Sequence, residues 1–211
     1  MESAKPSIAH MATTYRLTKT ESKAFDNPTM YKSVVGALQY ATITRPDLAY
    51  SVNRVWQFMG NPLEQHLVAV KRILRYLQGT LNLGIHLKPV VFDSSLPIIL
   101  TSLCDADWAT NLDDRKSISW VCLFVGPNLV TWWSKKQQTV SRSSTETEYK
   151  SLALAAQEII WVESLFSELN IPHQVPLILC DNLNTVSMSH NPVLHNRTKH
   201  IELDLFFVRG K

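Results

Sequence analysis

The longest regular pattern of apolar and polar positions lies between Ser143 and Asn170. Its core-facing positions recur in steps of four and three, which at about 100° per residue places them on one stripe of an α-helix. The stripe consists of Glu148, Leu152, Ala155, Ile159, Val162, Phe166 and Leu169. Its first member is a carboxylate, which is costly to bury alone. We therefore expect Glu148 to meet a cation, a metal ion or solvent.

Three shorter amphipathic patterns precede this helix. They predict helices over residues 30–43, 46–59 and 63–77, and the last of them ends at Gly79. The third helix has one apolar and one basic side. The basic side carries Lys71, Arg72 and Arg75, which could bind phosphates. Spacing alone favours a solvated helix face somewhat more.

Short apolar runs elsewhere predict strands. The predicted strands cover residues 83–87, 98–104, 118–125, 129–133 and 177–180. Short helices are expected after Asn182 and over residues 199–209. The runs 98–104 and 177–180 are apolar on both faces, as in central strands covered by helices. From Pro97 onwards the order is strand, strand, strand, long helix, strand, helix, which predicts an α/β fold with a mixed sheet flanked by helices.

The same pattern predicts how the chain is organised into domains. Residues 1–28 are polar and aperiodic, and we interpret them as an extended or disordered lead. Residues 29–90 form a small helical segment. The stretch from Lys88 to Pro97, with two prolines and two serines, is the expected domain boundary, and residues 97–211 form the α/β domain.

Composition excludes several classes of protein. No run reaches the roughly 18 apolar residues of a membrane span, and the polar lead lacks the apolar core of a signal peptide. The three cysteines lie in apolar strand-like runs, which indicates reduced thiols of an intracellular protein. The net charge of +3 is too small to indicate a nucleic-acid partner by itself.

Acids stand at the ends of two of the predicted strands. The tripeptide Leu-Cys-Asp occurs twice and ends at Asp105 and at Asp181. Open α/β sheets place their sites at the carboxyl ends of strands, so these two acids and Glu148 could converge. Taken singly, each acid is more often a strand-end or capping residue. Together they would suit Mg²⁺, which prefers carboxylate oxygens.

Two neighbouring acids compete for the same roles. Asp107 shares a strand face with Asp105, but Asp105 directly ends the apolar run. Glu146 lies about 200° around the helix from Glu148, on the opposite face. Glu146 also fits a capping box with Ser143. We therefore favour Asp105 and Glu148.

These residues carry a resemblance. The chain resembles the end of the reverse transcriptase and the ribonuclease H portion of a copia-type LTR retrotransposon Pol polyprotein. The matching segments are YKSVVGALQYATITRPDLAYSVNR, HLVAVKRILRYLQGT, CDADWA, DRKSISWVCLFVG, TWWSKKQQTVSRSSTETEY, LCDN and NPVLHNRTKHIELDLFFVR. They cover nearly everything from Tyr31 to Arg209, in the order of the family and with family-like gaps.

The resemblance implies a ribonuclease H-like fold that cuts the RNA strand of RNA–DNA hybrids with two Mg²⁺ ions, or with Mn²⁺ in their place. Asp105, Glu148 and Asp181 match the first three catalytic, metal-binding acids of the family. The implied partners are the hybrid and the remainder of the polyprotein. Hybrid binding is expected at Lys71, Arg72, Arg75, Arg197 and Lys199. The implied location is intracellular, in a cytoplasmic virus-like particle or in the nucleus.

The chain also departs from the family pattern. It lacks the Tyr-x-Asp-Asp motif of the polymerase palm, so we expect no DNA synthesis. It ends before the segment expected to supply the fourth acid and the last strand and helix, and Glu202 and Asp204 are weak substitutes. The alternative function is therefore a truncated hybrid-binding remnant with impaired catalysis. An integrase is disfavoured, because its acids run Asp, Asp, Glu.

Overall fold

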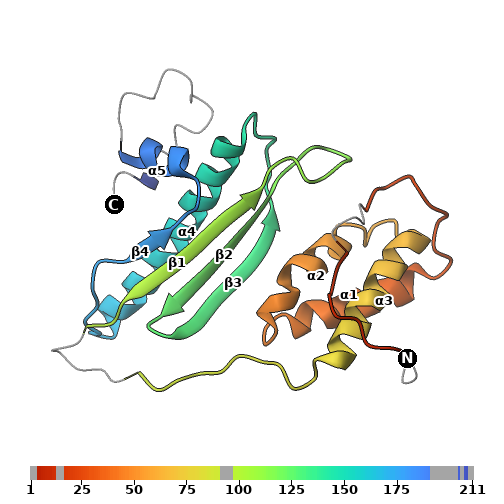
Figure 1. Ribbon diagram of the computed structural model, residues 1–211, viewed down its shortest axis with the longest axis horizontal. Helices are drawn as coiled ribbons and strands as arrows, with labels where there is room; N and C mark the ends of the chain where they lie inside the picture. Colours follow the sequence, from red (N-terminus) through yellow and green to blue (C-terminus); the bar gives the residue numbers. More distant parts are fainter. Residues whose placement is uncertain (1–3, 13–16, 91–96, 191–203, 205–206, 209–211) are drawn as a thin grey trace. The chain divides into compact units, whose positions relative to one another are not determined.

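The computed structural model describes residues 4–12, 17–90, 97–190, 204 and 207–208. It divides into two compact units (Figure 1). The first unit runs to Ile85 and includes Asn111–Asp114, and the second comprises the rest of the chain. The predicted fold class is confirmed: a helical segment precedes a mixed sheet flanked by helices, which is consistent with a ribonuclease H-like fold.

Helices make up the regular structure of the first unit. They are α1 (Pro28–Ala41), the 3₁₀ helix η1 (Pro46–Leu48), α2 (Ala49–Trp56) and α3 (Glu64–Gly79). α1 begins where the Asn27 side chain accepts a hydrogen bond from the Met30 amide, 3.0 Å away. Buried side chains from α1, α2 and α3 form its core, and Leu17 from the N-terminal segment joins them. The predicted strand over residues 83–87 is wrong, because these residues form no strand.

His66 shows how the third helix is fixed at its start. Its ring is fully buried and stacks on Phe58. Nδ1 accepts a hydrogen bond from the Leu63 amide at 2.9 Å, so Nε2 carries the proton and donates to the Thr18 carbonyl at 2.9 Å. Burial lowers the pKa of His66, which keeps the ring neutral. The histidine is therefore a structural cap.

The second unit is built on a sheet with the strand order β3-β2-β1-β4 within the described part of the chain. The strands are β1 (Leu100–Asp107), β2 (Ile118–Val125), β3 (Asn128–Lys136) and β4 (Leu177–Leu179). β2 pairs antiparallel with both β1 and β3, whereas β4 runs parallel to β1. The turn between β2 and β3 uses Gly126 at a φ of 53°, where a side chain would be strained.

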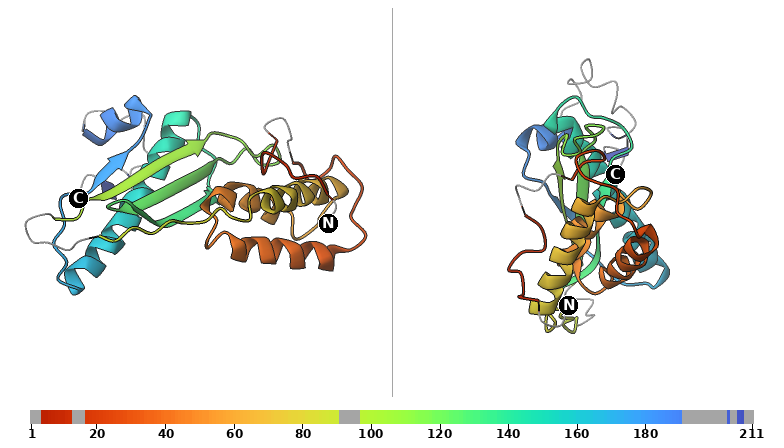
Figure 2. Two further views of the ribbon diagram at one scale, coloured as in Figure 1. Left: turned by 60° about the horizontal axis from the view of Figure 1, so that its bottom comes forward. Right: turned by 90° about the vertical axis from the view of Figure 1, so that its right-hand side faces the viewer.

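Helix α4 (Ser144–Glu168) packs along one face of this sheet, against β1, β2 and β4 (Figures 1 and 2). The helix α5 (Leu183–His190) packs against α4. The predicted stripe of α4 is buried from Glu148 to Phe166. Leu169 is the exception: it is the C-cap and 58% exposed.

Two further expectations can be compared with the described residues. The run 177–180 is not a central strand, because β4 pairs only with β1 among these residues and its side chains are partly exposed. The predicted helix over 199–209 falls largely outside them, although Asp204, Phe207 and Val208 are helical. None of the helices described here is both long and apolar enough to cross a membrane.

Candidate metal centre

The register between β1 and β4 brings the two Leu-Cys-Asp tripeptides together. Thr101, Ser102 and Leu103 pair in parallel with Leu177, Ile178 and Leu179. Just beyond this pairing, the Cys104 and Cys180 thiols interact, and Asp105 and Asp181 both lie near enough to Glu148 to raise its pKa. The two tripeptides thus pair directly only at their leucines, Leu103 and Leu179, and β4 ends there.

Asp105 is held in position from two sides. Its Oδ2 accepts a hydrogen bond from Trp120 Nε1 at 2.9 Å, and its Oδ1 accepts one from the Ala106 amide at 2.6 Å. Trp120 is the direct partner of Asp105 across the β1–β2 ladder. The Ser151 hydroxyl on α4 donates to the Asp105 carbonyl at 2.8 Å and ties the helix to the strand here.

Glu148 points into the same region from the second turn of α4. The residue is only 7% exposed, and its Oε2 is buried without a hydrogen-bond partner. Burial is the main cause that raises its pKa to about 8, and Asp105, Cys180 and Asp181 raise it further. A buried carboxyl among acids, with an unsatisfied oxygen, needs either a proton or a cation.

Asp181 and Cys180 lie beside Glu148 and offer further ligand atoms, and Cys180 was not predicted from the sequence as a site residue. Ligand atoms of Glu148, Cys180 and Asp181 all lie within 4.8 Å of one another. The sequence signal for Cys180 is the repeated Leu-Cys-Asp, in which a thiol precedes each acid. Interaction with the neighbouring Cys104 thiol lowers the pKa of Cys180, and interaction with Cys180 together with burial raises that of Cys104, whose Sγ donates to the Leu179 carbonyl at 3.8 Å.

The competing acids lie elsewhere. Asp107 is exposed at the end of β1. Glu146 accepts hydrogen bonds from the Arg142 amide at 2.8 Å and from Lys150 Nζ at 3.0 Å. The Ser143 hydroxyl caps α4 by accepting from the Glu146 amide, as the capping box predicts, but the Glu146 carboxylate reaches Arg142 and not Ser143. Glu146 therefore serves the start of the helix.

The basic residues predicted to bind nucleic acid differ in how far their side chains are already hydrogen-bonded within the protein. Lys71 is exposed on α3. Arg72 and Arg75 each donate from Nε to a backbone carbonyl of the N-terminal segment, those of Ala9 at 3.1 Å and Lys5 at 2.7 Å. Both arginines thus have a structural role that the sequence did not predict. Arg197 and Lys199 lie outside the described residues.

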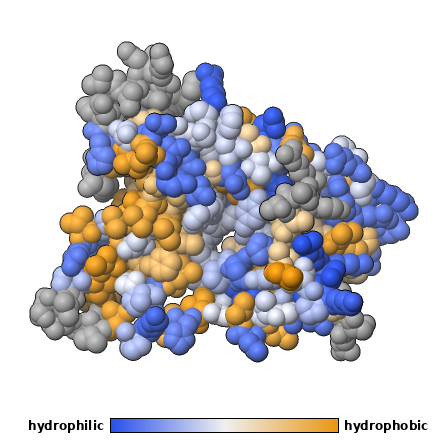
Figure 3. All heavy atoms as spheres, viewed as in Figure 1, coloured by the Kyte–Doolittle hydropathy of each residue, from blue (hydrophilic) through white to orange (hydrophobic). Residues whose placement is uncertain are grey.

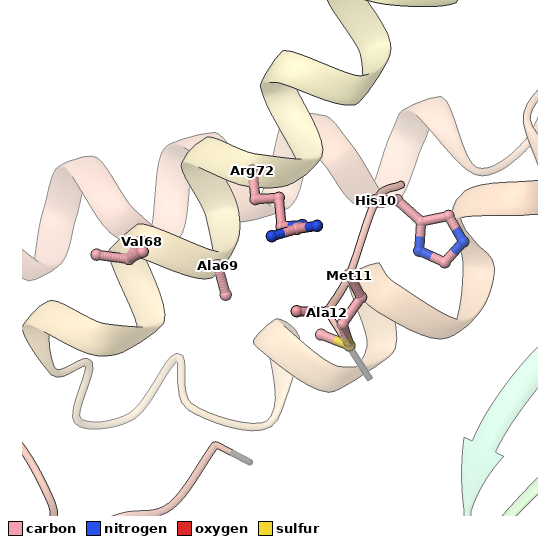
Figure 4. A pocket seen from close by; sticks show the side chains of 6 residues that line it. All are labelled: His10, Met11, Ala12, Val68, Ala69 and Arg72. Atoms are coloured by element: carbon pink, nitrogen blue, oxygen red, sulfur yellow. The ribbon is translucent and has the colours of Figure 1, made fainter. Parts of the chain in front are cut away.

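Arg72 also lines a small cavity of about 80 Å³ in the first unit. Figure 4 shows its guanidinium reaching from α3 towards the segment that carries Met11 and Ala12. The remaining lining residues are His10, Val68 and Ala69. The cavity is mostly apolar and no carboxylate lines it, so it does not resemble a metal centre.

The sequence is similar to those of several known proteins. The chain is 44% identical to the retrovirus-related Pol polyprotein from transposon RE1 of Arabidopsis thaliana, over an alignment that covers 100% of the chain and 14% of that relative. It is 35% identical to the Pol polyprotein from transposon TNT 1-94 of Nicotiana tabacum, over 99% of the chain and 16% of the relative. It therefore spans about a seventh of the length of these polyproteins.

One relative is short enough that the alignment covers most of its length. The chain is 42% identical to the secreted RxLR effector protein 161 of Plasmopara viticola, over 63% of the chain and 90% of that protein. No protein-family model and no solved structure matches the chain. Over its whole length, the chain is thus a homologue of one segment of the retrovirus-related Pol polyproteins of copia-type transposons.

Proposed function

We propose that the second unit is a ribonuclease H that hydrolyses the RNA strand of RNA–DNA hybrids within a retrotransposon Pol polyprotein. The observation that carries this proposal is the buried, unsatisfied Oε2 of Glu148: ligand atoms of Glu148 and Asp181 lie within 4.8 Å of each other, and Asp105 is near enough to raise the pKa of Glu148. Homology to Pol polyproteins supports it, because such a polyprotein is a setting in which hybrids would be processed.

The residues present fit a hard divalent cation. Asp105, Glu148 and Asp181 offer carboxylate oxygens, the ligands that Mg²⁺ prefers, and Mn²⁺ suits the same donors. Metal bound there would supply Lewis-acid stabilisation of the phosphate and an activated water. A cation beside Glu148 would also satisfy the orphaned oxygen and favour the ionised carboxylate.

The chain's own residues prepare this chemistry before any ligand arrives. Trp120 orients the Asp105 carboxylate, and Ser151 locks α4 to β1 at the same level. The parallel pairing of β1 and β4 brings the chain to Asp181 close to the strand that carries Asp105. A preorganised group of this kind costs little reorganisation when substrate binds.

Cleavage of the RNA strand in a labelled hybrid, with and without Mg²⁺, tests the proposal. We expect metal-dependent cleavage that Asp105→Asn, Glu148→Gln and Asp181→Asn each reduce by about a hundredfold or more, since removal of one such stabilising group typically costs that much. The DNA strand should remain intact.

Matched controls lie one or two residues away. Glu146→Gln keeps an oxygen for the Arg142 amide, and Asp107→Asn changes an exposed acid, so both variants should retain most of the activity. Activity that is lost in Glu146→Gln but kept in Glu148→Gln would refute the assignment. Binding of hybrid without cleavage by the unmodified chain would favour the alternative, a hybrid-binding remnant.

The same proposal includes the residues that would contact the hybrid and the place where the protein would act. Hybrid would contact Lys71, Arg72, Arg75, Arg197 and Lys199, and the protein would act in a cytoplasmic particle or in the nucleus. If phosphate contacts dominate binding, the logarithm of affinity falls steeply with the logarithm of salt concentration. Replacing Lys71 alone by Ala should reduce that slope by about one.

A further inference from the structure

We propose that Glu148, Cys180 and Asp181 form a binding site for a thiophilic divalent cation such as Zn²⁺. Occupation of this site would block the magnesium-dependent reaction. Only this inhibitory consequence rests on the proposed function, because the binding itself follows from the donor atoms.

The spacing of the donors suits zinc. Tetrahedral Zn²⁺ binds sulfur at about 2.3 Å and carboxylate oxygen at about 2.0–2.2 Å, which holds its ligand atoms roughly 3.3–3.7 Å apart. The three donor atoms here already lie within 4.8 Å of one another, so small side-chain rotations would close the site. Three protein ligands leave one position for water or a phosphate oxygen.

A separate observation points to a ligand at this place. Glu148 is more than nine-tenths buried, and its Oε2 has no hydrogen-bond partner although it lies in a group of potential donors to a metal. The Cys104 side chain interacts with the Cys180 thiol and is only 3% exposed, so it shields one side of that thiol from water. Glu148 is thus a desolvated donor, Cys180 is half-buried, and Asp181 is exposed and leaves the site open to an ion from solvent.

The Cys180 thiol determines which metal ion binds most tightly to these three ligands. Soft thiolate ligands select zinc over magnesium, whereas carboxylates alone do not. Zn²⁺ bound to Glu148, Cys180 and Asp181 would occupy two of the three acids proposed for Mg²⁺. The two metals would therefore compete, and zinc would leave Asp105 as the remaining acid of the group.

Cadmium reports the thiolate directly, because a bound thiolate gives a charge-transfer absorption that histidine and carboxylate ligands do not. The reduced full chain is titrated with Cd²⁺, and its Zn²⁺ affinity is measured by competition with a chromophoric chelator. We expect one Cd²⁺ per chain with a thiolate band. Cys180→Ser should abolish the band and weaken Zn²⁺ binding at least tenfold, and Glu148→Gln should also weaken Zn²⁺ binding.

Cys122→Ser is the matched control, since Cys122 is a thiol of the same sheet on β2 and outside the donor group. It should leave the band and the zinc affinity unchanged. Cys180→Ala provides a second variant, and circular dichroism verifies that each variant is folded. A band that survives in Cys180→Ser or Cys180→Ala, or that disappears in Cys122→Ser, would overturn the proposal.

The inhibitory consequence is measured separately, in the hybrid-cleavage assay. Half-inhibition by zinc should require more Zn²⁺ when Mg²⁺ is raised tenfold, and more in Cys180→Ser than in the unmodified chain. Zinc binding without any cleavage activity would contradict the proposed ribonuclease function but support the zinc site. Cleavage that is indifferent to zinc would overturn the inhibitory link.

Discussion

Glu148 links the site to the stability of the fold. Its pKa is raised from 4.5 to about 8 by burial and by neighbouring acids, so the folded state favours the protonated carboxyl more than the unfolded state does. The contribution of this carboxyl to stability is therefore fully present below about pH 4.5. It is lost as the pH rises through about 8, provided that no metal is bound.

Thermal unfolding of the second unit between pH 5 and pH 9 checks this sign. In the absence of metal, the unmodified chain should lose stability over this interval relative to Glu148→Gln, whose amide stays neutral. The variant should melt at the higher temperature at pH 9, and Mg²⁺ at pH 8 should stabilise the unmodified chain more than the variant. Parallel pH profiles for the two chains would contradict the assignment.

Trp120 is a second residue with a testable role, because it positions the carboxylate of Asp105. Its indole donates to Asp105 Oδ2, and a hydrogen bond to a charged group contributes about 1.5–3 kcal/mol. We expect Trp120→Phe to cleave hybrid about tenfold more slowly and to require more Mg²⁺ for half-maximal activity, while remaining folded. Trp133→Phe loses a comparable bond, to Glu158 at 2.8 Å, and should keep both properties. Equal effects of the two substitutions would assign Trp120 a merely structural role.

At the scale of elements, α4 was predicted with its buried face, whereas β4 was predicted as a strand but not as a partly exposed one. Helix α4 is 25 residues long, and its buried stripe from Glu148 to Phe166 and the Ser143 cap both agree with the sequence pattern. β4 is three residues long, and a short apolar run does not distinguish a buried strand from an exposed one. Its partner β1 lies far away in the sequence, so the pairing that brings Cys180 beside Cys104 has no local signature.

The position of β4 leads to a prediction about association. Leu177 and Leu179 are 50% and 45% exposed, and Figure 3 shows apolar side chains gathered over β4 and the adjoining part of β1. Lysine on an edge strand opposes pairing with another chain. Leu177→Lys and Leu179→Lys should therefore reduce self-association at high concentration, measured by sedimentation.

A helix residue provides the comparison for this edge effect. Trp161 on α4 is 63% exposed, and Trp161→Lys removes an apolar side chain of similar exposure without altering a strand. It should change self-association less than either substitution on β4. A larger effect of Trp161→Lys would show that general surface hydrophobicity, and not the strand edge, drives the association.

On the scale of the whole molecule, each cluster of buried apolar residues lies within one of the two units. One cluster fills the first unit, and two fill the second. Ile73 and Leu123 are both fully buried, one in each unit. Truncating either to Ala should cost about 2–5 kcal/mol. We expect the loss to be confined to the unit that carries the substitution.

Magnesium binding should likewise stabilise the second unit and leave the stability of the first unit unchanged. A ligand that binds only the folded second unit stabilises it by about 2.7 kcal/mol at a concentration of 100 times its Kd. Hydrogen exchange measured on peptides from each unit should therefore show added protection around β1, α4 and β4, and none in α1 or α3. Mg²⁺ should offset part of the damage of Leu123→Ala and none of that of Ile73→Ala. Equal protection of both units would mean that the metal binds elsewhere or that the units unfold as one.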